Sequence, residues 1–360
     1  MKILRIICTA LFVVSFVSCK KSSSSSNNSS SSSTDQTTLK KNVINDIANN
    51  VIYATYVDLS NKADALNADV TNLNGATSAE NLLVCQNSWK ALRQTWEQGE
   101  GFLVGPVSTE NIDPRVDTWP VDFARLDSVL ASSATFDAAY VNGLEESLKG
   151  FHPIEYLLFG KDGNKTETEF TAREKQYLIA LTANLASLCK SVKDAWTNGY
   201  TNTFTNPGSS NTIYGSQRAV YEEIIDAMSG ICEEVAGGKL KEPFEAVDPM
   251  LEESPFAKNS INDFTNNIKS VQNVYLGKYT TDGKGLEDLI KANNLSMDGE
   301  IKSKINAAIN ALGNITLPFG QAILTANGQR QQVQAAMDAI GELHDYLDTT
   351  VKPYIQTLVN

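Results

Sequence analysis

The chain has 360 residues, of which 42% are hydrophobic and 20% charged, with 42 acidic against 30 basic side chains. The ordinary apolar fraction excludes wholesale disorder, and the length predicts about two domains at roughly 150 residues each. The formal charge of -12 argues against nucleic acid as a partner, because proteins that bind it normally present a basic face. Two histidines, His152 and His344, are too few for a metal site built from three.

The first 18 residues have the pattern of a lipoprotein signal peptide. Lys2 and Arg5 precede an apolar run over residues 6–17, which is too short to cross a bilayer comfortably. The run ends in Phe-Val-Ser-Cys at Cys19, which resembles a bacterial lipobox cleaved before this cysteine and acylated on it. The alternative is an ordinary secretory peptide that contains a cysteine.

Residues 19–35 are expected to form a tether. Residues 20–34 read KKSSSSSNNSSSSST, and a segment of this composition is a flexible coil with a reach of about 20–25 Å. A tether makes sense behind a lipid anchor, so we favour the lipoprotein over the secretory alternative. No later run reaches about 18 consecutive apolar residues, so no transmembrane helix is predicted. We expect lipid anchoring in the bacterial cell envelope, at its periplasmic face or outer surface.

Cys85, Cys189 and Cys232 remain once the signal-peptide cysteine and Cys19 are set aside. Their number is odd and none forms a C-x-x-C pair, so neither a disulfide framework nor a zinc-thiolate site is indicated. One disulfide would still fit, but buried free thiols are the favoured state.

The rest of the chain has the pattern of an all-α protein made of two helical bundles. Gly- and Pro-containing breaks separate long segments with apolar residues at helical spacing, and no convincing alternating strand pattern occurs. We expect an N-terminal bundle over residues 36–165 and a C-terminal bundle over residues 166–360. The long helix after Thr166 could serve either bundle. Examples of the helical spacing are Val43, Ile47, Val51 and Ala54, and Leu178, Leu181, Leu185, Leu188, Val192 and Trp196.

The segment from Gly105 to Asp122 departs from this helical pattern. It holds three prolines, Trp119 and four acids, Asp117 and Asp122 among them. A long aromatic loop in a helical protein is often functional. The alternative is a surface loop that packs Trp119 on a bundle end.

The strongest candidate for chemistry is the segment GFHPIEYLLFG over residues 150–160. His152 and Glu155 are three residues apart, so on a helix they share a face and could converge on one ion. The segment is apolar on all sides, which predicts burial, and a buried glutamate is costly unless it is paired, hydrogen-bonded or bound to a metal. The alternative is a His–Glu hydrogen bond within the core.

A second carboxylate is expected to point inward. Glu100 lies about 40° from Trp96 on the apolar face of its helix. Glu97 lies at the edge of that face, where an exposed i,i+4 ion pair with Arg93 would explain it. One histidine and two carboxylates suit iron, manganese or calcium better than a thiolate-loving metal.

These residues resemble a known family. GFHPIEYLLFG resembles the G-x-H-x-x-E signature of the imelysin-like proteins, also classed as peptidase family M75. WKALRQTWEQGEGFLVGPV over residues 89–107 is similar to the family's helix ending in a Glu-x-Phe-x-x-Gly-Pro turn. Residues 117–122 resemble its Trp-Pro loop, and residues 254–279 resemble its C-terminal signature. The four segments run in the family's order and span most of the chain after the tether.

The resemblance implies two related bundles around a cleft lined by the signature segment. It also implies an exported, often lipid-anchored protein linked to iron uptake, with iron as the metal and iron-uptake proteins as partners. His152 and Glu155 match the signature pair, and Glu100 and Asp122 match acidic positions expected near it, so these four are the expected metal ligands. Further residues expected to line the cleft are Asp117, Trp119 and Asp263.

The leading interpretation is a binding protein that captures iron or an iron-bearing ligand. The first alternative is an M75-type metallopeptidase that uses the same residues to hold a water-activating ion. Zinc peptidases commonly carry H-E-x-x-H or H-x-x-E-H, whereas here Pro153 follows His152 and Tyr156 follows Glu155. The second histidine is missing, and His344 is expected on a solvated surface. The second alternative is a scaffold lipoprotein whose cleft binds a partner peptide.

We predict that the mature protein reaches membranes through Cys19 alone. Cys19→Ser should therefore yield unprocessed precursor without lipid, because the acylated thiol is lost. Membrane fractionation and mass spectrometry of the purified variant would measure this. A Cys19→Ser protein that still carries lipid would contradict the lipobox.

Overall fold

The computed structural model describes residues 29–326 and 328–359. The expected signal peptide (1–18), Cys19 and the tether as far as residue 28 lie outside the described residues. Helix α1 begins at Ser29, within the expected tether. The prediction of a coil is therefore wrong for residues 29–34. Extending an existing helix adds one hydrogen bond per residue and avoids the cost of a new nucleus, so the helix continues into the polar run.

Every regular element among the described residues is a helix, which confirms the all-α prediction. The α-helices are α1 (Ser29–Asp46), α2 (Ala54–Gly75), α3 (Ala79–Glu97), α4 (Pro106–Thr109), α5 (Asp113–Val116), α6 (Phe123–Ala131), α7 (Ala138–Asn142), α8 (Phe151–Phe159), α9 (Ala172–Ala195), α10 (Thr201–Thr205), α11 (Gln217–Glu233), α12 (Lys241–Ala246), α13 (Ser260–Leu276), α14 (Leu286–Asn293), α15 (Leu295–Gly313), α16 (Phe319–Ala322), α17 (Arg330–Tyr346) and α18 (Lys352–Leu358). Short 3-10 helices are η2 (Glu100–Phe102), η3 (Glu146–Leu148), η4 (Glu167–Glu169) and η7 (Pro249–Leu251). Four π-helical turns continue longer helices: η1 (Ile47–Tyr53), η5 (Trp196–Tyr200), η6 (Glu234–Lys239) and η8 (Leu347–Val351).

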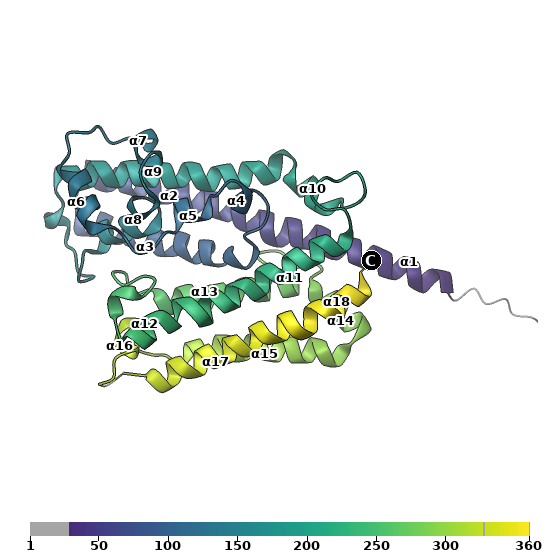
Figure 1. Cartoon of the computed structure of the whole chain (residues 1–360). Coiled ribbons are helices and arrows are strands. Elements are labelled where there is room, and N and C mark those ends of the chain that lie inside the picture. Colours follow the sequence, from purple (N-terminus) through teal and green to yellow (C-terminus); the bar gives the residue numbers. More distant parts are fainter. Residues whose placement is uncertain (1–28, 327, 360) are drawn as a thin grey trace, which may run out of the picture. The chain divides into compact units, whose positions relative to one another are not determined.

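Helices α2, α3, α8 and α9 form the first bundle (Figure 1). Helix α9 begins at a capping box, in which the Thr171 hydroxyl accepts the Glu174 N–H and the Glu174 carboxylate accepts the Thr171 N–H. It packs along α2. The long helix after Thr166 therefore serves the first bundle, although it follows the expected boundary at residue 165. The domain limits themselves stay a prediction.

Helices α11, α13, α15 and α17 form the second bundle, with α17 packed on both α11 and α15. Their apolar stripes supply its core, as on α13, where Phe264, Ile268, Val271 and Val274 are fully buried. The two bundles meet where α13 packs on α3 and on η2. Gly101 permits this close approach, because a Cβ at its position would lie 2.2 Å from Ser270 Oγ.

The structure describes three cysteines, and their state was predicted from the sequence. Cys85, Cys189 and Cys232 are buried and free, which confirms the prediction of free thiols.

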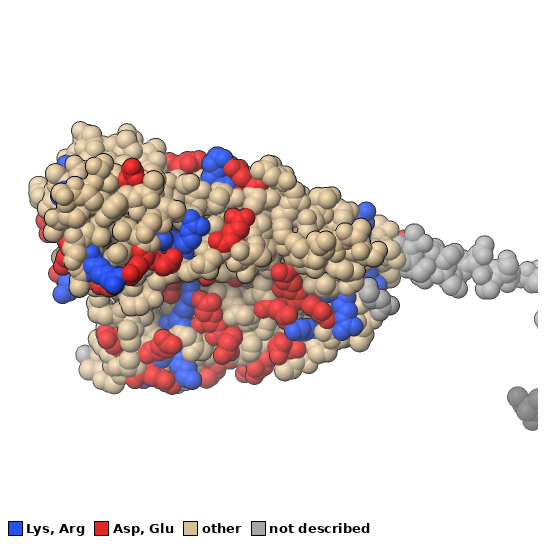
Figure 2. Space-filling model, turned by 45° about the horizontal axis from the view of Figure 1, so that its top comes forward, with Lys and Arg blue, Asp and Glu red and all other residues tan. Residues whose placement is uncertain are grey.

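None of the helices in the described part of the chain is long and apolar enough to cross a membrane. On the face drawn in Figure 2, acidic side chains are interspersed with basic ones.

Helix α8 carries the signature segment and is fixed tightly at its start. Gly150 has φ +80°, and a Cβ there would lie 2.2 Å from the Val116 carbonyl oxygen. The Trp89 indole N–H donates to the Phe151 carbonyl oxygen at 3.1 Å, and the two rings pack edge to face. These contacts set α8 against α3 and against the end of α5.

We predict that Gly150→Ala destabilises the fold by about 3 kcal/mol, because it combines left-handed strain with a backbone clash. Urea unfolding would measure the loss. The matched control is Gly299→Ala, inside α15, where a Cβ meets no atom within 4 Å. That change should stabilise the protein by about 0.5–1 kcal/mol. Equal effects of the two substitutions would contradict the proposed strain at Gly150.

Candidate functional site

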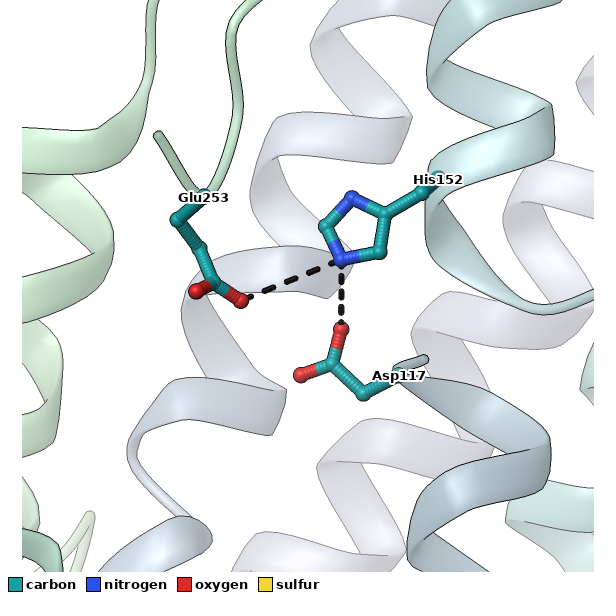
Figure 3. A group of neighbouring side chains, drawn as sticks. All are labelled: Asp117, His152 and Glu253. Atoms are coloured by element: carbon teal, nitrogen blue, oxygen red, sulfur yellow. Dashed lines mark ion pairs between the residues drawn. The ribbon is translucent and has the colours of Figure 1, made fainter. Parts of the chain in front are cut away.

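The candidate site surrounds the His152 imidazole, which is fully buried between the two bundles. Its Nε2 lies 3.1 Å from Asp117 Oδ1 and 3.8 Å from Glu253 Oε1 (Figure 3). Its Nδ1 lies 3.4 Å from Glu155 Oε2. Asp117 follows α5, whereas Glu253 precedes α13 in the second bundle. The imidazole therefore faces carboxylates contributed by both bundles.

Glu155 connects the signature helix to the second bundle. Its Oε1 accepts the backbone N–H of Phe256 at 3.0 Å and that of Ala257 at 2.7 Å. Its other oxygen faces His152 Nδ1. A carboxylate on one ring nitrogen fixes the orientation of the other. Glu155 thus turns His152 Nε2 toward Asp117 and Glu253.

The Arg93 guanidinium from α3 lies at the centre of the carboxylates. Its Nη2 is 2.5 Å from Glu97 Oε1 and 2.6 Å from Glu253 Oε1, and its Nη1 contacts Asp117. The predicted Arg93–Glu97 pair therefore forms. The prediction that it is exposed is wrong, because both side chains are fully buried. Helix α13 covers this edge of α3, which the helical period of α3 alone cannot show.

Glu100 is buried, as predicted. The predicted reason is wrong, because α3 ends at Glu97 and Glu100 begins the separate 3-10 helix η2, to which the helical angle from Trp96 does not apply. The Glu100 Oε2 accepts from Asn267 Nδ2 at 2.6 Å and lies 3.3 Å from Lys239 Nζ. Oxygens of Glu97, Glu100 and Asp117 lie within 4.8 Å of one another, and so do ligand atoms of Asp117, His152 and Glu253. Asp117 is therefore shared by two groups of possible metal ligands.

The other expected residues have different surroundings. Asp122 caps α6, where its carboxylate accepts the Arg125 N–H at 3.0 Å, and its side chain is 41% exposed. It is absent from both groups of possible ligands among the described residues, so it contributes no ligand atom to either. The local backbone N–H groups at the start of α6 account for its position.

Two of the residues expected to line the cleft lie close to the site, although in different ways. The Trp119 ring packs on the His152 ring, with the ring centres 5.0 Å apart. Buried Asp263 accepts from Ser254 Oγ and Asn259 Nδ2, each at 2.7 Å, and lies 3.9 Å from Arg93 Nε. The segment 105–122, which was expected to be a loop, holds the short helices α4 and α5 and is turned inward at Asp117 and Trp119. Asp263 lies beside Arg93 rather than beside His152.

Sequence reasoning missed Glu253, Lys239 and Asn267. Glu253 comes directly before the segment 254–279 that resembles the C-terminal family signature, which is the one signal that could have found it. Lys239 ends a π-helical turn and Asn267 lies within α13. Both come from elements far along the chain from α3 and α8, so no local spacing connects them with the signature.

His344 lies apart from this site. Its Nδ1 is 2.9 Å from Ser229 Oγ and its Nε2 is 3.7 Å from Glu233. The side chain is partly buried rather than fully solvated. It therefore supplies no second histidine to the groups of possible ligands around His152.

The site is held together by opposite charges on side chains that are largely buried. Burial opposes ionisation of Asp117, but Arg93 and His152 hold its pKa well below the usual range. Burial also disfavours a charged His152, yet the contacts with Asp117 and Glu155 raise its pKa to about 9. Burial and the neighbouring Glu97 raise the pKa of Glu100 well above its usual range. The contacts of His152 with the two carboxylates therefore favour the protonated imidazole at neutral pH.

We predict that this proton stabilises the fold. The His152 pKa of about 9 in the fold exceeds the usual histidine pKa of 6.5, so the stabilisation is complete below pH 6.5 and is lost as pH rises through about 9. The loss should be on the order of 3 kcal/mol. Urea unfolding of metal-free protein between pH 6 and 9.5 would measure it.

In this experiment, His152→Gln should flatten the decline in stability over that pH range, because no imidazolium remains to be deprotonated. The matched control is His344→Gln, which leaves the carboxylates around His152 untouched and should keep the wild-type slope. A wild-type slope in His152→Gln would contradict the assignment.

The comparisons with known proteins agree with one another. A family model described as imelysin, peptidase M75, matches residues 52–347. Iron-regulated protein A of Synechococcus elongatus is 28% identical over 329 residues, which cover 89% of this chain and 88% of that protein.

Two solved structures share the fold. An imelysin-like protein from Psychrobacter arcticum has a TM-score of 0.73 at 12% identity, over 88% of this chain and 95% of that one. A protein described as an iron-regulated protein A precursor, from Parabacteroides distasonis, has a TM-score of 0.79 at 24% identity, over 90% of this chain and 95% of that one. At these sequence identities, the structural similarity shows that the arrangement of the helices is shared.

Proposed function

This chain belongs to the imelysin family, and from that premise we propose that it is a lipid-anchored binding protein that captures iron, or an iron-bearing ligand, for uptake. The observation that carries the proposal is the His152 Nε2, which faces carboxylates of both bundles inside the protein. The name of the Synechococcus relative, iron-regulated protein A, supports iron as the metal.

The residues present fit a metal ion. His152 Nε2 is buried and makes no hydrogen bond of normal geometry, although Asp117 Oδ1 is 3.1 Å away. Ligand atoms of Asp117, His152 and Glu253 lie within 4.8 Å of one another. One imidazole and two carboxylates form a mixed nitrogen and oxygen set that suits iron or manganese. We assign the capture of the ion to these three side chains.

The remaining expected ligands take other roles in this proposal. Glu155 orients the imidazole and joins the signature helix to the loop that carries Glu253. Glu100 belongs to the neighbouring carboxylate group, where it contacts Lys239 and Asn267.

The burial of the site favours capture over peptide hydrolysis. A hydrolase needs an open coordination position, with a general base beside it and room for the substrate. Here the His152 side chain is fully buried, and those of Asp117 and Glu253 are less than a tenth exposed. A single ion needs far less room than a polypeptide. The M75 metallopeptidase is therefore the second candidate, supported by the class of the family rather than by the geometry.

The cellular setting of this proposal comes from the N-terminal sequence. A signal peptide, acylated Cys19 and a polar tether would hold the protein at the membrane of the cell envelope. Proteins of iron uptake would be its partners there, since a captured ion must be passed on.

We predict that purified protein binds iron stoichiometrically and that His152→Ala and Glu253→Gln each weaken binding by more than about 100-fold, because each removes a ligand atom. Equilibrium dialysis with anaerobic Fe²⁺ would measure the affinity. The matched control is Glu252→Gln. Glu252 is also buried, but its Oε2 accepts from Ser260 Oγ at 2.7 Å, so this variant should bind iron like wild type.

Two outcomes of these experiments would overturn the proposal. Wild-type affinity in both His152→Ala and Glu253→Gln would place the metal elsewhere. Metal-dependent peptide cleavage by the wild type that Glu155→Gln abolishes would favour the peptidase.

A further inference from the structure

Among the cations of the buried site, Lys239 lies nearest to the surface. Its side chain is 11% exposed, whereas those of Arg93 and His152 are fully buried. Its Nζ lies 3.3 Å from Glu100 Oε2 and 3.4 Å from Glu253 Oε1. The Lys239 ammonium therefore lies beside two buried carboxylates and is itself partly exposed.

The ammonium also has a partner on the outside. Glu234 Oε1 lies 3.3 Å from Lys239 Nζ, and the Glu234 side chain is 54% exposed. The two residues begin and end the π-helical turn η6, which joins α11 to α12. Single π-helical turns within longer helices are frequent at functional sites. Lys239 thus has carboxylates on the buried and on the solvent side, within reach of one flexible side chain.

A metal ion and this ammonium would compete for one carboxylate. Glu253 Oε1 is the atom that faces His152 Nε2 at 3.8 Å, and it is also the atom 3.4 Å from Lys239 Nζ. Arg93 Nη2 already lies 2.6 Å from the same oxygen, so an ion beside Glu253 would add a third cation to it. Cations gathered on one buried oxygen repel one another strongly, because the surrounding protein screens charge poorly. Binding of an ion beside Glu253 therefore favours an ammonium that has moved away.

The other two cations are less able to move aside. Arg93 Nη2 contacts Glu97 and Glu253, and its Nη1 contacts Asp117, so the guanidinium is held on several sides and has no exposed partner. His152 is fixed by Glu155 and by the Trp119 ring. Lys239 is the one member of this cationic set with an exposed carboxylate beside it.

We propose that Lys239 is a tethered cation that closes the capture site, and that a metal ion enters when the ammonium withdraws from Glu100 and Glu253 toward Glu234. The inference rests on the proposed function and adds the route of the ion and the residue that controls it. Lys239 occupies the carboxylates while no metal is bound, which keeps their charge compensated. The entering ion then compensates the negative charge of these carboxylates in place of the ammonium.

The experiment measures the rate and affinity of Fe²⁺ binding under anaerobic conditions by stopped-flow tryptophan fluorescence. Trp96 and Trp119 are suitable reporters, because Trp96 Nε1 donates to Asp117 Oδ2 at 2.7 Å and the Trp119 ring lies 5.0 Å from the His152 ring. Equilibrium dialysis of the same samples gives the affinity independently of fluorescence.

Lys239→Met keeps much of the side-chain volume but removes the charge. If the open state is a minor one, populated at about 10% or less, this variant should bind Fe²⁺ about tenfold faster and about tenfold more tightly. Glu234→Gln removes the outer partner and should slow binding by about two- to fivefold, as expected for the loss of an exposed ion pair. The two variants therefore move the association rate in opposite directions.

The matched control is Lys241→Met, which removes the same charge two residues away. Lys241 pairs only weakly with Glu245, at 4.0 Å on the surface, so this variant should keep the wild-type rate and affinity. Thermal unfolding of each variant checks that it is folded. A merely structural Lys239 would show lower stability and weaker binding in Lys239→Met, without any effect of Glu234→Gln on the rate.

The outcomes separate this inference from the proposed function. Iron binding by the wild type with unchanged or slower association in Lys239→Met overturns the closing role of Lys239 and leaves the capture function standing. Absence of iron binding in the wild type and in every variant overturns both. Faster binding in Lys239→Met together with slower binding in Glu234→Gln supports both.

Discussion

The site and the contact between the bundles depend on the buried ion pairs of the Arg93 guanidinium. Arg93 lies on α3, yet it contacts Asp117 from the loop after α5 and Glu253 from the second bundle. Removing one partner from a buried ion pair leaves an uncompensated charge and costs about 3–5 kcal/mol. The helix, the loop and the second bundle must therefore be in place together, and the position of each carboxylate follows from the arginine.

This constraint makes the interface between the bundles polar at its centre, although apolar helix faces surround it. Each buried carboxylate there has a cation or a hydrogen-bond donor beside it, as Glu155 has the backbone N–H groups of Phe256 and Ala257. Arg93, Lys239 and the proton on His152 compensate the negative charge of the metal-free protein. Capture of a metal ion would then exchange one positive charge for another within an existing network, so the fold need not change to receive it.

Much of the site could be read from local patterns. The apolar surroundings of His152 and Glu155 indicated a buried pair on one helix face. Glu100 is buried as expected, but it lies in η2 beyond the end of α3, so the helical angle from Trp96 was not the reason. The same reasoning failed for Glu97, which a helix wheel places at an edge but which α13 covers. Asp122 was expected from the family resemblance, and in the structure its carboxylate caps α6 instead of joining the two groups of possible ligands among the described residues.

The sequence by itself determined the helical class, the apolar stripes and the burial of the signature pair, because periodicity and composition act over a few turns of one helix. Only the tertiary structure decided that Asp117, rather than Asp122, meets the imidazole, and that Glu253 and Lys239 complete its surroundings. Asp117 lies 35 positions from His152, whereas Glu253 lies 101 positions from His152 and Lys239 lies 139 positions from Glu100. These contacts depend on how one bundle packs on the other, and a buried charge finds its partner by that packing rather than by its position in the chain.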